Sequence, residues 1–199
     1  MAIAPGARTH STIPATSPAT TLASILTASV LLVPAAYAST QPCERRAPTP
    51  ETSRGPHDFS VLPAEDRLWR DGDAGEPLVL RARVLDTCGR PIAAARVRIL
   101  HANHYGEHEP DRWRAELSSN ARGEFQVTTV YPGYAGSLAR HIHFIIEHPG
   151  YRPLVTRLFF KNDPAVDARI EPLAVVLDEV RHGGVTGWVG GYEFVLAPR

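Results

Sequence analysis

The fold prediction begins from the stretch Arg140-His141-Ile142-His143-Phe144-Ile145-Ile146. Ile142, Phe144 and Ile146 alternate with the two histidines, which is the period of a β-strand that buries one face in a core. Side chains two positions apart on a strand point the same way, so both imidazoles lie on one face. Because neutral imidazole is a common metal ligand, this pair predicts either a shared metal ion or two histidines on a solvated face.

Other segments with strand-like alternation flank this stretch, and Gly/Pro turns separate them. The expected strands cover residues 78–85, 95–99, 123–129, 140–146, 153–160, 173–177 and 192–196. The segment 101–121 is expected to be irregular, and no stretch longer than about ten residues carries a helical stripe. Short strands at regular spacing predict an all-β fold, an antiparallel β-sandwich.

Residues 1–38 are interpreted as a secretory signal peptide. They contain one arginine and no acidic residue, an apolar run over residues 22–33, and a small-x-small cleavage site at Ala36-Tyr37-Ala38. The run is too short and too interrupted for a membrane span; a Thr/Pro-rich disordered tail is the other interpretation. We therefore expect a periplasmic or secreted protein without membrane attachment after cleavage.

Residues 39–76 are rich in proline and charge and predict an extended arm that lies across a β-sandwich domain at residues 77–199. The chain has two cysteines, Cys43 and Cys88. In an oxidising compartment such a pair predicts a disulfide rather than a metal site.

The 199 residues carry 21 basic and 21 acidic side chains. A near-neutral balance without basic clusters argues against nucleic acid or an anionic membrane as partner. The length after cleavage suits one domain with a sizeable core. Nothing in the composition predicts the oligomeric state.

Several short motifs occur together in one order: Cys43, Thr49-Pro50-Glu51, Gly55-Pro56, Gly75-Glu76-Pro77-Leu78, Val84-Leu85-Asp86, Gly89-Arg90-Pro91-Ile92, Ala95 to Ile99, His101-Ala102-Asn103, Gly123-Glu124-Phe125, Thr129 to Gly133, the His-x-His strand and Leu154 to Phe160. In this order and spacing the sequence resembles the intradiol ring-cleavage dioxygenases of the catechol and protocatechuate type. The resemblance implies a non-haem Fe(III) held by two tyrosinates and two histidines. It also implies a catechol-type substrate, O2, and a muconate-type diacid as product.

The resemblance assigns the metal ligands one position at a time. His141 and His143 match the two histidines of the family motif. Tyr134 is the candidate for the tyrosine after Pro-Gly, although it follows Gly133 directly and Ala135 occupies the family's usual position.

The position of the family's other tyrosine is occupied by His108. Three interpretations follow: His108 is a ligand, nearby Tyr105 replaces it, or the iron chemistry has been lost. The family also places an arginine close to the metal. Here Arg140 directly precedes the strand, and Arg157 stands where the family has a glutamine, so both are candidates for stabilising charge on the aromatic ring.

The main expectation is an exported intradiol dioxygenase that cleaves a catechol-type ring with O2. A non-catalytic periplasmic binding module on the same sandwich is an alternative, because fold does not determine function. A copper or zinc site is another, because three imidazoles also suit those ions.

Overall fold

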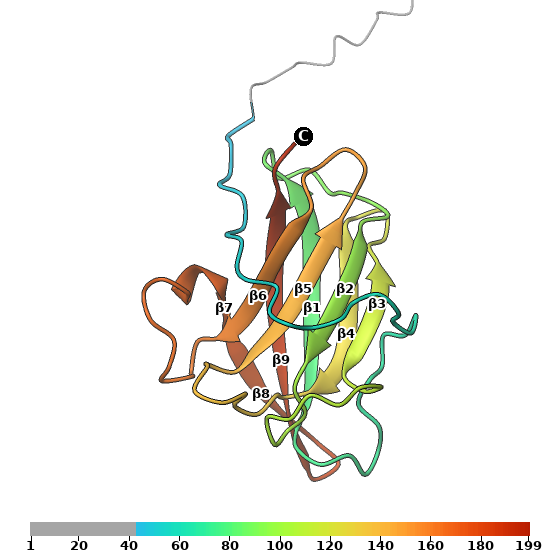
Figure 1. Cartoon of the computed structure of the whole chain (residues 1–199), viewed down its shortest axis with the longest axis vertical. Helices are drawn as coiled ribbons and strands as arrows, with labels where there is room; N and C mark the ends of the chain where they lie inside the picture. Colours follow the sequence, from blue (N-terminus) through green and yellow to red (C-terminus); the bar gives the residue numbers. More distant parts are fainter. Residues whose placement is uncertain (1–42) are drawn as a thin grey trace, which may run out of the picture. The chain divides into compact units, whose positions relative to one another are not determined.

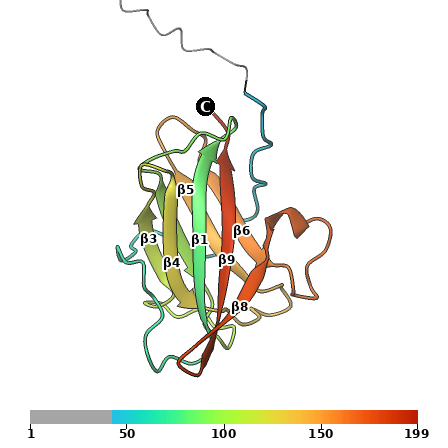
Figure 2. The ribbon, with the colours of Figure 1, turned by 180° about the vertical axis from the view of Figure 1, so that it is seen from behind.

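The computed structural model describes residues 43–199; the expected signal peptide and the first residues of the expected arm lie outside the described residues. Two β-sheets pack face to face in a sandwich (Figures 1 and 2). One sheet contains, in spatial order, β4 (Glu124–Val130), β1 (Pro77–Asp86), β9 (Val185–Leu196) and β8 (Leu177–His182). The other contains β3 (Arg114–Ser118), β2 (Arg96–His101), β5 (His141–Glu147), β6 (Leu154–Phe160) and β7 (Ala174–Val175).

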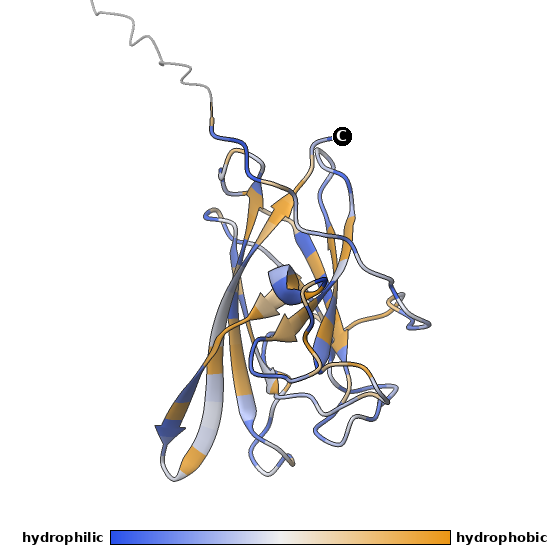
Figure 3. Ribbon diagram, turned by 90° about the vertical axis from the view of Figure 1, so that its left-hand side faces the viewer, coloured by the Kyte–Doolittle hydropathy of each residue, from blue (hydrophilic) through white to orange (hydrophobic). Residues whose placement is uncertain are grey.

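The β-sandwich expected from the alternating pattern is confirmed. Most neighbouring strands are antiparallel, and two pairs, β1 with β9 and β6 with β7, are parallel. Hydrophobic residues recur along the strands of both sheets (Figure 3). Within residues 43–199 the helical element is the 3-10 turn η1 (Glu171–Leu173), and no helix there is long and apolar enough to cross a membrane.

Three strands differ from the sequence pattern. β3 lies in the segment that was expected to be irregular. Its alternation of buried and exposed residues is weak, and its hydrogen-bonded pairing with β2 makes it a strand. The expected strand 173–177 divides into η1, β7 and the start of β8. β9 begins at Val185, earlier than expected, because glycines conceal its period. At Gly190 a Cβ would lie 2.6 Å from Cδ2 of Leu177, so a larger residue would need the Leu177 side chain to move.

The core lies between the sheets. Its largest fully buried side chains include Phe144 and Ile142 of β5, Phe194 of β9 and Leu80 of β1. Because Ile142 and Phe144 face this core, the alternating residues of β5 point to the outer face of their sheet. That outer face carries the two histidines.

Residues 43–76 form an extended segment, here called the arm, which crosses the outer face of β6, β5 and β2 (Figure 1). A disulfide joins Cys43 to Cys88, with their Cα atoms 5.2 Å apart. Further along, the hydroxyl of Thr156 donates a hydrogen bond to the Pro50 carbonyl at 2.7 Å. Phe59 is 1% exposed and packs in a small cluster on the outer face of the sheet. The arm thus covers the face on which the histidines lie.

Candidate metal centre

His141 and His143 lie on the outer face of β5 and are both buried beneath the arm. Their Nε2 atoms are 3.0 Å apart. The Nδ1 atom of His141 lies 2.7 Å from the Ala139 carbonyl, which accepts a hydrogen bond from it. A ring that donates from Nδ1 carries its lone pair on Nε2, the arrangement in which a histidine binds a metal. Local structure therefore prepares His141 as a ligand.

His143 carries a buried nitrogen that has no partner. Its Nδ1 atom makes no hydrogen bond within the described part of the chain. Buried polar atoms without a partner are rare, and binding of an ion or a water is one of the usual reasons for them. The side chain is 2% exposed. This orphaned nitrogen is consistent with a site built for an additional group.

His108 reaches the same place from the loop that follows β2. The Asn103 side-chain oxygen accepts hydrogen bonds from the backbone N–H groups of Tyr105 and Glu107, each at 2.9 Å. Gly106 has φ +87°, and a Cβ at this position would lie 1.9 Å from the Tyr134 carbonyl oxygen. Only glycine allows the two loops to pack this closely. The loop that holds His108 is therefore fixed by Asn103 and Gly106.

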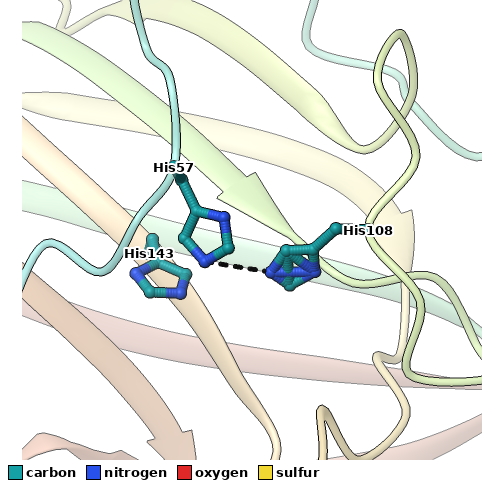
Figure 4. A group of neighbouring side chains, drawn as sticks. All are labelled: His57, His108 and His143. Carbon is teal, nitrogen blue, oxygen red and sulfur yellow. Dashed lines mark hydrogen bonds between the residues drawn. The ribbon is translucent and has the colours of Figure 1, made fainter.

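A fourth histidine, His57, comes from the arm, and the sequence reasoning missed it. The Nε2 atom of His57 lies 3.1 Å from Nε2 of His108. Gly55, with φ +71°, brings the arm so close that a Cβ would lie 3.4 Å from Cε1 of His143. Figure 4 shows the three rings directed toward one another. One possible ligand atom from each of His57, His108 and His143 lies within 4.8 Å of the others.

The four imidazoles are held in their neutral form. Burial, together with the charges of His108, His141 and Arg157, lowers the pKa of His57 to about 4. Burial, followed by the neighbouring histidines, lowers the pKa of His143 to about 2. The pKa values of His141 and His108 are also lowered, in both cases mainly by burial. Since neutral imidazole is the metal-binding form, these shifts keep the rings available as ligands near neutral pH.

A pocket of about 410 Å³ opens over the cluster. Its lining consists of Pro56, His57, Gly106, His108, Ala135, Gly136, Leu138, His141, His143 and Arg157. None of these residues carries a carboxylate, phenol or thiol. Arg157 is the charged residue, and its buried Nε atom has no hydrogen-bond partner among residues 43–199. Burial lowers the pKa of its guanidinium. A cation without an anionic partner in a pocket of this kind favours a negatively charged ligand.

The two candidate tyrosines are not in this pocket, which corrects the expectation drawn from the sequence. The hydroxyl of Tyr134 donates a hydrogen bond to Asp163 at 3.4 Å, and its ring lies under the Arg140 guanidinium. Ala135, one position later, lines the pocket instead. Tyr105 is 70% exposed and packs against His104. The one-residue offset after Gly133 thus directs the phenol away from the histidines.

Arg140 also lies apart from the cluster. Its guanidinium stacks over the rings of Tyr131 and Tyr134, at 5.1 and 4.2 Å from their centroids. It lines a separate small cavity of about 170 Å³ that includes Trp188. Because Arg140 and His141 are neighbours at the start of a strand, their side chains point to opposite faces. Of the two candidate arginines, the structure brings Arg157 to the histidines.

A larger hollow, of about 870 Å³, lies on the outer face of the other sheet. Several of its charged groups have partners in the hollow: Arg46 and Arg83 form ion pairs with Glu193, and Arg81 donates a hydrogen bond to the neutral side chain of Gln126. Size alone does not identify a reactive site. The unpaired, buried and metal-ligating groups gather at the histidine pocket, and we place the candidate centre there.

The donor set fits a non-haem metal ion in its ligand type and spacing, because imidazole binds iron, zinc and copper. His57, His108 and His143, whose ligand atoms lie within 4.8 Å of one another, are the residues that would hold it, and His141 lies beside them with its Nε2 atom 3.0 Å from that of His143. The resemblance implied a ferric ion held by two tyrosinates, and the candidate tyrosines are not among the pocket residues.

Similarity to known proteins agrees with the fold. A family model described as "Dioxygenase" matches residues 60–198, which include every strand and three of the four clustered histidines. The chain belongs to the intradiol ring-cleavage dioxygenase family. The family prediction from the ordered motifs is thereby confirmed. His57 precedes the matched region, so the family pattern offered no signal for it; its signal was a histidine after Gly-Pro in an arm expected to cross the domain.

Catechol 1,2-dioxygenase 2 of Acinetobacter lwoffii is 31% identical over 176 residues, covering 70% of this chain and 64% of that enzyme. The 6-chlorohydroxyquinol 1,2-dioxygenase of Cupriavidus pinatubonensis is 32% identical over 123 residues, covering 49% of this chain and 45% of that enzyme. This family member therefore spans less than two thirds of the length of these relatives.

Solved structures show the same sandwich. The dioxygenase domain of a dioxygenase and carbohydrate-binding protein fusion from Streptomyces sp. SirexAA-E has a TM-score of 0.68 at 26% identity, covering 77% of this chain and all of that domain. The 3-chlorocatechol 1,2-dioxygenase of Rhodococcus opacus has a TM-score of 0.67 at 24% identity, covering 76% of this chain and 73% of that one. The shared region is the β-sandwich domain.

Proposed function

We propose that this family member binds a catechol-type aromatic in the histidine pocket and cleaves its ring with O2. The bond that breaks joins the two hydroxyl-bearing carbons, and both oxygen atoms of O2 enter a muconate-type diacid. The reaction balances without an external reductant, because the ring supplies the electrons that reduce O2. The observation that carries the proposal is the position of Arg157 beside the clustered histidines, in the same pocket.

The chain's own residues bind and orient the substrate. A non-haem iron ion held by the imidazoles would act as Lewis acid and as template for the two catechol oxygens. Arg157 is an unpaired cation at the pocket wall, so it favours the deprotonated, anionic form of a catechol and stabilises charge that develops on the ring. Leu138 and Ala135 provide apolar surface for the aromatic face. The pocket's 410 Å³ suits a ligand with a single ring.

The test is an oxygen-uptake assay on iron-loaded protein with a panel of catechols and hydroxyquinols. Oxygen consumption should accompany a product heavier than the substrate by one O2, and 18O2 should label both new carboxyl groups. Arg140→Gln, which removes an arginine outside the pocket, serves as a control variant and should consume oxygen as wild type does. Full iron loading without oxygen uptake on any member of the panel would refute the proposal.

We also propose that the protein is exported and acts in an oxidising compartment. The Cys43–Cys88 disulfide supports this, because structural disulfides persist mainly outside the cytosol. The residue composition of positions 1–38 supports it independently. Mass spectrometry of the mature protein should find an N-terminus near Ser39, and an intact N-terminus on cytosolic protein would contradict export.

A further inference from the structure

We propose that the arm supplies a metal ligand, His57, and that the resulting all-imidazole site holds its iron as Fe(II). The inference rests on the same metal centre as the proposed function and concerns how that centre is built. Its structural basis is the meeting of a residue from the arm with rings from the loop after β2 and from β5.

The spacing of the nitrogens is the first reason. Two imidazole nitrogens bound to one ion at about 2.0–2.1 Å lie about 2.9–3.4 Å apart, depending on the angle between the bonds. The Nε2 atoms of His57 and His108 are 3.1 Å apart, and those of His141 and His143 are 3.0 Å apart. An N–H···N hydrogen bond also gives this distance, so one pair of nitrogens alone does not distinguish a metal site from a hydrogen bond. A possible ligand atom of His143 also lies within 4.8 Å of those of His57 and His108, and among the described residues the His143 Nδ1 atom makes no hydrogen bond.

The second reason is that the arm is anchored on both sides of His57. Before it, the Thr52 N–H donates to the Val155 carbonyl at 2.9 Å. After it, Phe59 is buried and its carbonyl accepts a hydrogen bond from Arg98 at 3.2 Å. Gly55 provides the close approach between these anchors. His57 therefore lies at the site in a backbone that is already fixed, so little ordering is needed for it to bind.

The oxidation state follows from the charge of the donor set. Among residues 43–199, those that line the pocket include four histidines and the cation Arg157, and none of them carries an anionic side chain. Neutral nitrogen donors in place of anionic ones raise the reduction potential of iron, as imidazole does when it replaces thiolate in iron–sulfur centres. A pocket with this charge stabilises Fe(II) relative to Fe(III).

Calorimetric titration of metal-free protein with Fe(II), under anaerobic conditions, tests His57 directly. His57→Ala should raise the dissociation constant at least about tenfold, since removal of even an outer-shell partner of a metal ligand costs about 10–100-fold. The matched control is His104→Ala, because His104 is exposed and does not line the pocket. Circular dichroism establishes that both variants fold. A His57→Ala variant that binds Fe(II) as tightly as wild type overturns the proposal.

Hydrogen exchange of the arm provides a second readout that does not depend on activity. Fe(II) should slow exchange of the amides at residues 52–60 in wild type and in His104→Ala, and leave them unchanged in His57→Ala. Equal protection in all three proteins would mean that the arm makes no bond to the ion.

The midpoint potential of the iron in wild type should be more positive than in His108→Tyr, which adds a phenolate. A wild-type potential at or below that of the variant overturns the Fe(II) assignment.

The two proposals fail separately. If His57→Ala loses Fe(II) affinity while wild type consumes no oxygen with any catechol, the ring-cleavage function is wrong and the arm ligand stands. If ring cleavage occurs and His57→Ala binds Fe(II) normally, the function stands and the arm ligand is wrong.

Discussion

His143 on β5 and Arg157 on β6 occupy directly opposed positions in the antiparallel register of these strands. Opposed residues on one sheet face have Cβ atoms about 4.5–5.5 Å apart, so the imidazole and the guanidinium share one wall of the pocket. Neither group is fully partnered: the buried atoms Nδ1 of His143 and Nε of Arg157 make no hydrogen bond among the described residues. The pair places a metal-binding group beside a group that attracts an anion, which a chelating, anionic substrate requires.

Arg157→Gln should weaken the binding of a catechol by about 10–100-fold, because a hydrogen bond to a charged group contributes about 1.5–3 kcal/mol. Its affinity for the metal should not fall, since the variant removes a positive charge that repels the ion. Titration of metal-loaded protein with a non-reacting catechol analogue measures the first effect, and metal content measures the second. Arg140→Gln should change neither. A variant that lost metal as well as catechol affinity would show that Arg157 supports the histidines instead.

Neighbouring residues of β5 should have separable roles. His143→Ala should lower metal affinity and should cost less free energy of unfolding than Phe144→Ala, because the His143 ring packs beneath the arm and not in the core between the sheets. Phe144→Ala should lower that free energy by about 3–5 kcal/mol, because Phe144 is 0% exposed within the core. Denaturant unfolding and metal analysis of the two variants measure these effects. If His143→Ala kept a full equivalent of iron, His143 would not be a ligand.

The sequence predicted the sandwich and the shared face of His141 and His143 because both follow from the two-residue period of β5. The full set of residues at the metal centre was harder to predict from the sequence. Tyr134 was expected as a ligand from the family resemblance, and a shift of one residue in its loop directs its hydroxyl to Asp163. His57 lies 51 positions from its contact His108, in a segment with no period. Where an irregular arm crosses a sheet depends on long-range packing, which local pattern does not encode.

Acid should destabilise the metal-free protein. The pKa values of His57 and His101 are lowered to about 4, and that of His143 to about 2, in each case mainly by burial. The unfolded chain binds these protons near pH 6.5, whereas the folded chain does not. The free energy of unfolding should therefore be greatest above about pH 6.5 and fall as the pH decreases toward these folded values.

Thermal unfolding of metal-free protein between about pH 8 and pH 4 measures this dependence. Between about pH 6.5 and pH 5 most carboxylates remain ionised, so the loss in that window belongs to histidines. His143→Asn should reduce the slope there, and His104→Ala should not, because His104 is exposed. A midpoint temperature that stays constant or rises across this window would contradict the assignment.

The disulfide should stabilise the position of the arm as well as the fold. Cys43 and Cys88 are 45 positions apart, and loop-closure entropy gives roughly 4 kcal/mol as the upper estimate for such a bridge. Cys43→Ser combined with Cys88→Ser should lower the free energy of unfolding by up to this amount. It should leave Fe(II) affinity largely intact, because Thr52 and Phe59 anchor the arm nearer to His57. Complete loss of metal in the double variant would show that those anchors are insufficient.

His108→Tyr should restore the anionic donor that the family has at this position. Phenolate bound to Fe(III) absorbs strongly in the visible range, so the iron-loaded, air-oxidised variant should be coloured, whereas wild type, without a phenol in its pocket, should show no such band. Tyr134→Phe in the same background should leave the band unchanged, because the Tyr134 hydroxyl donates to Asp163 and does not reach the pocket. Absorption spectra of the single and double variants measure this. A visible band in wild type that disappears on Tyr134→Phe would instead place Tyr134 on the metal and restore the ligand expected from the sequence.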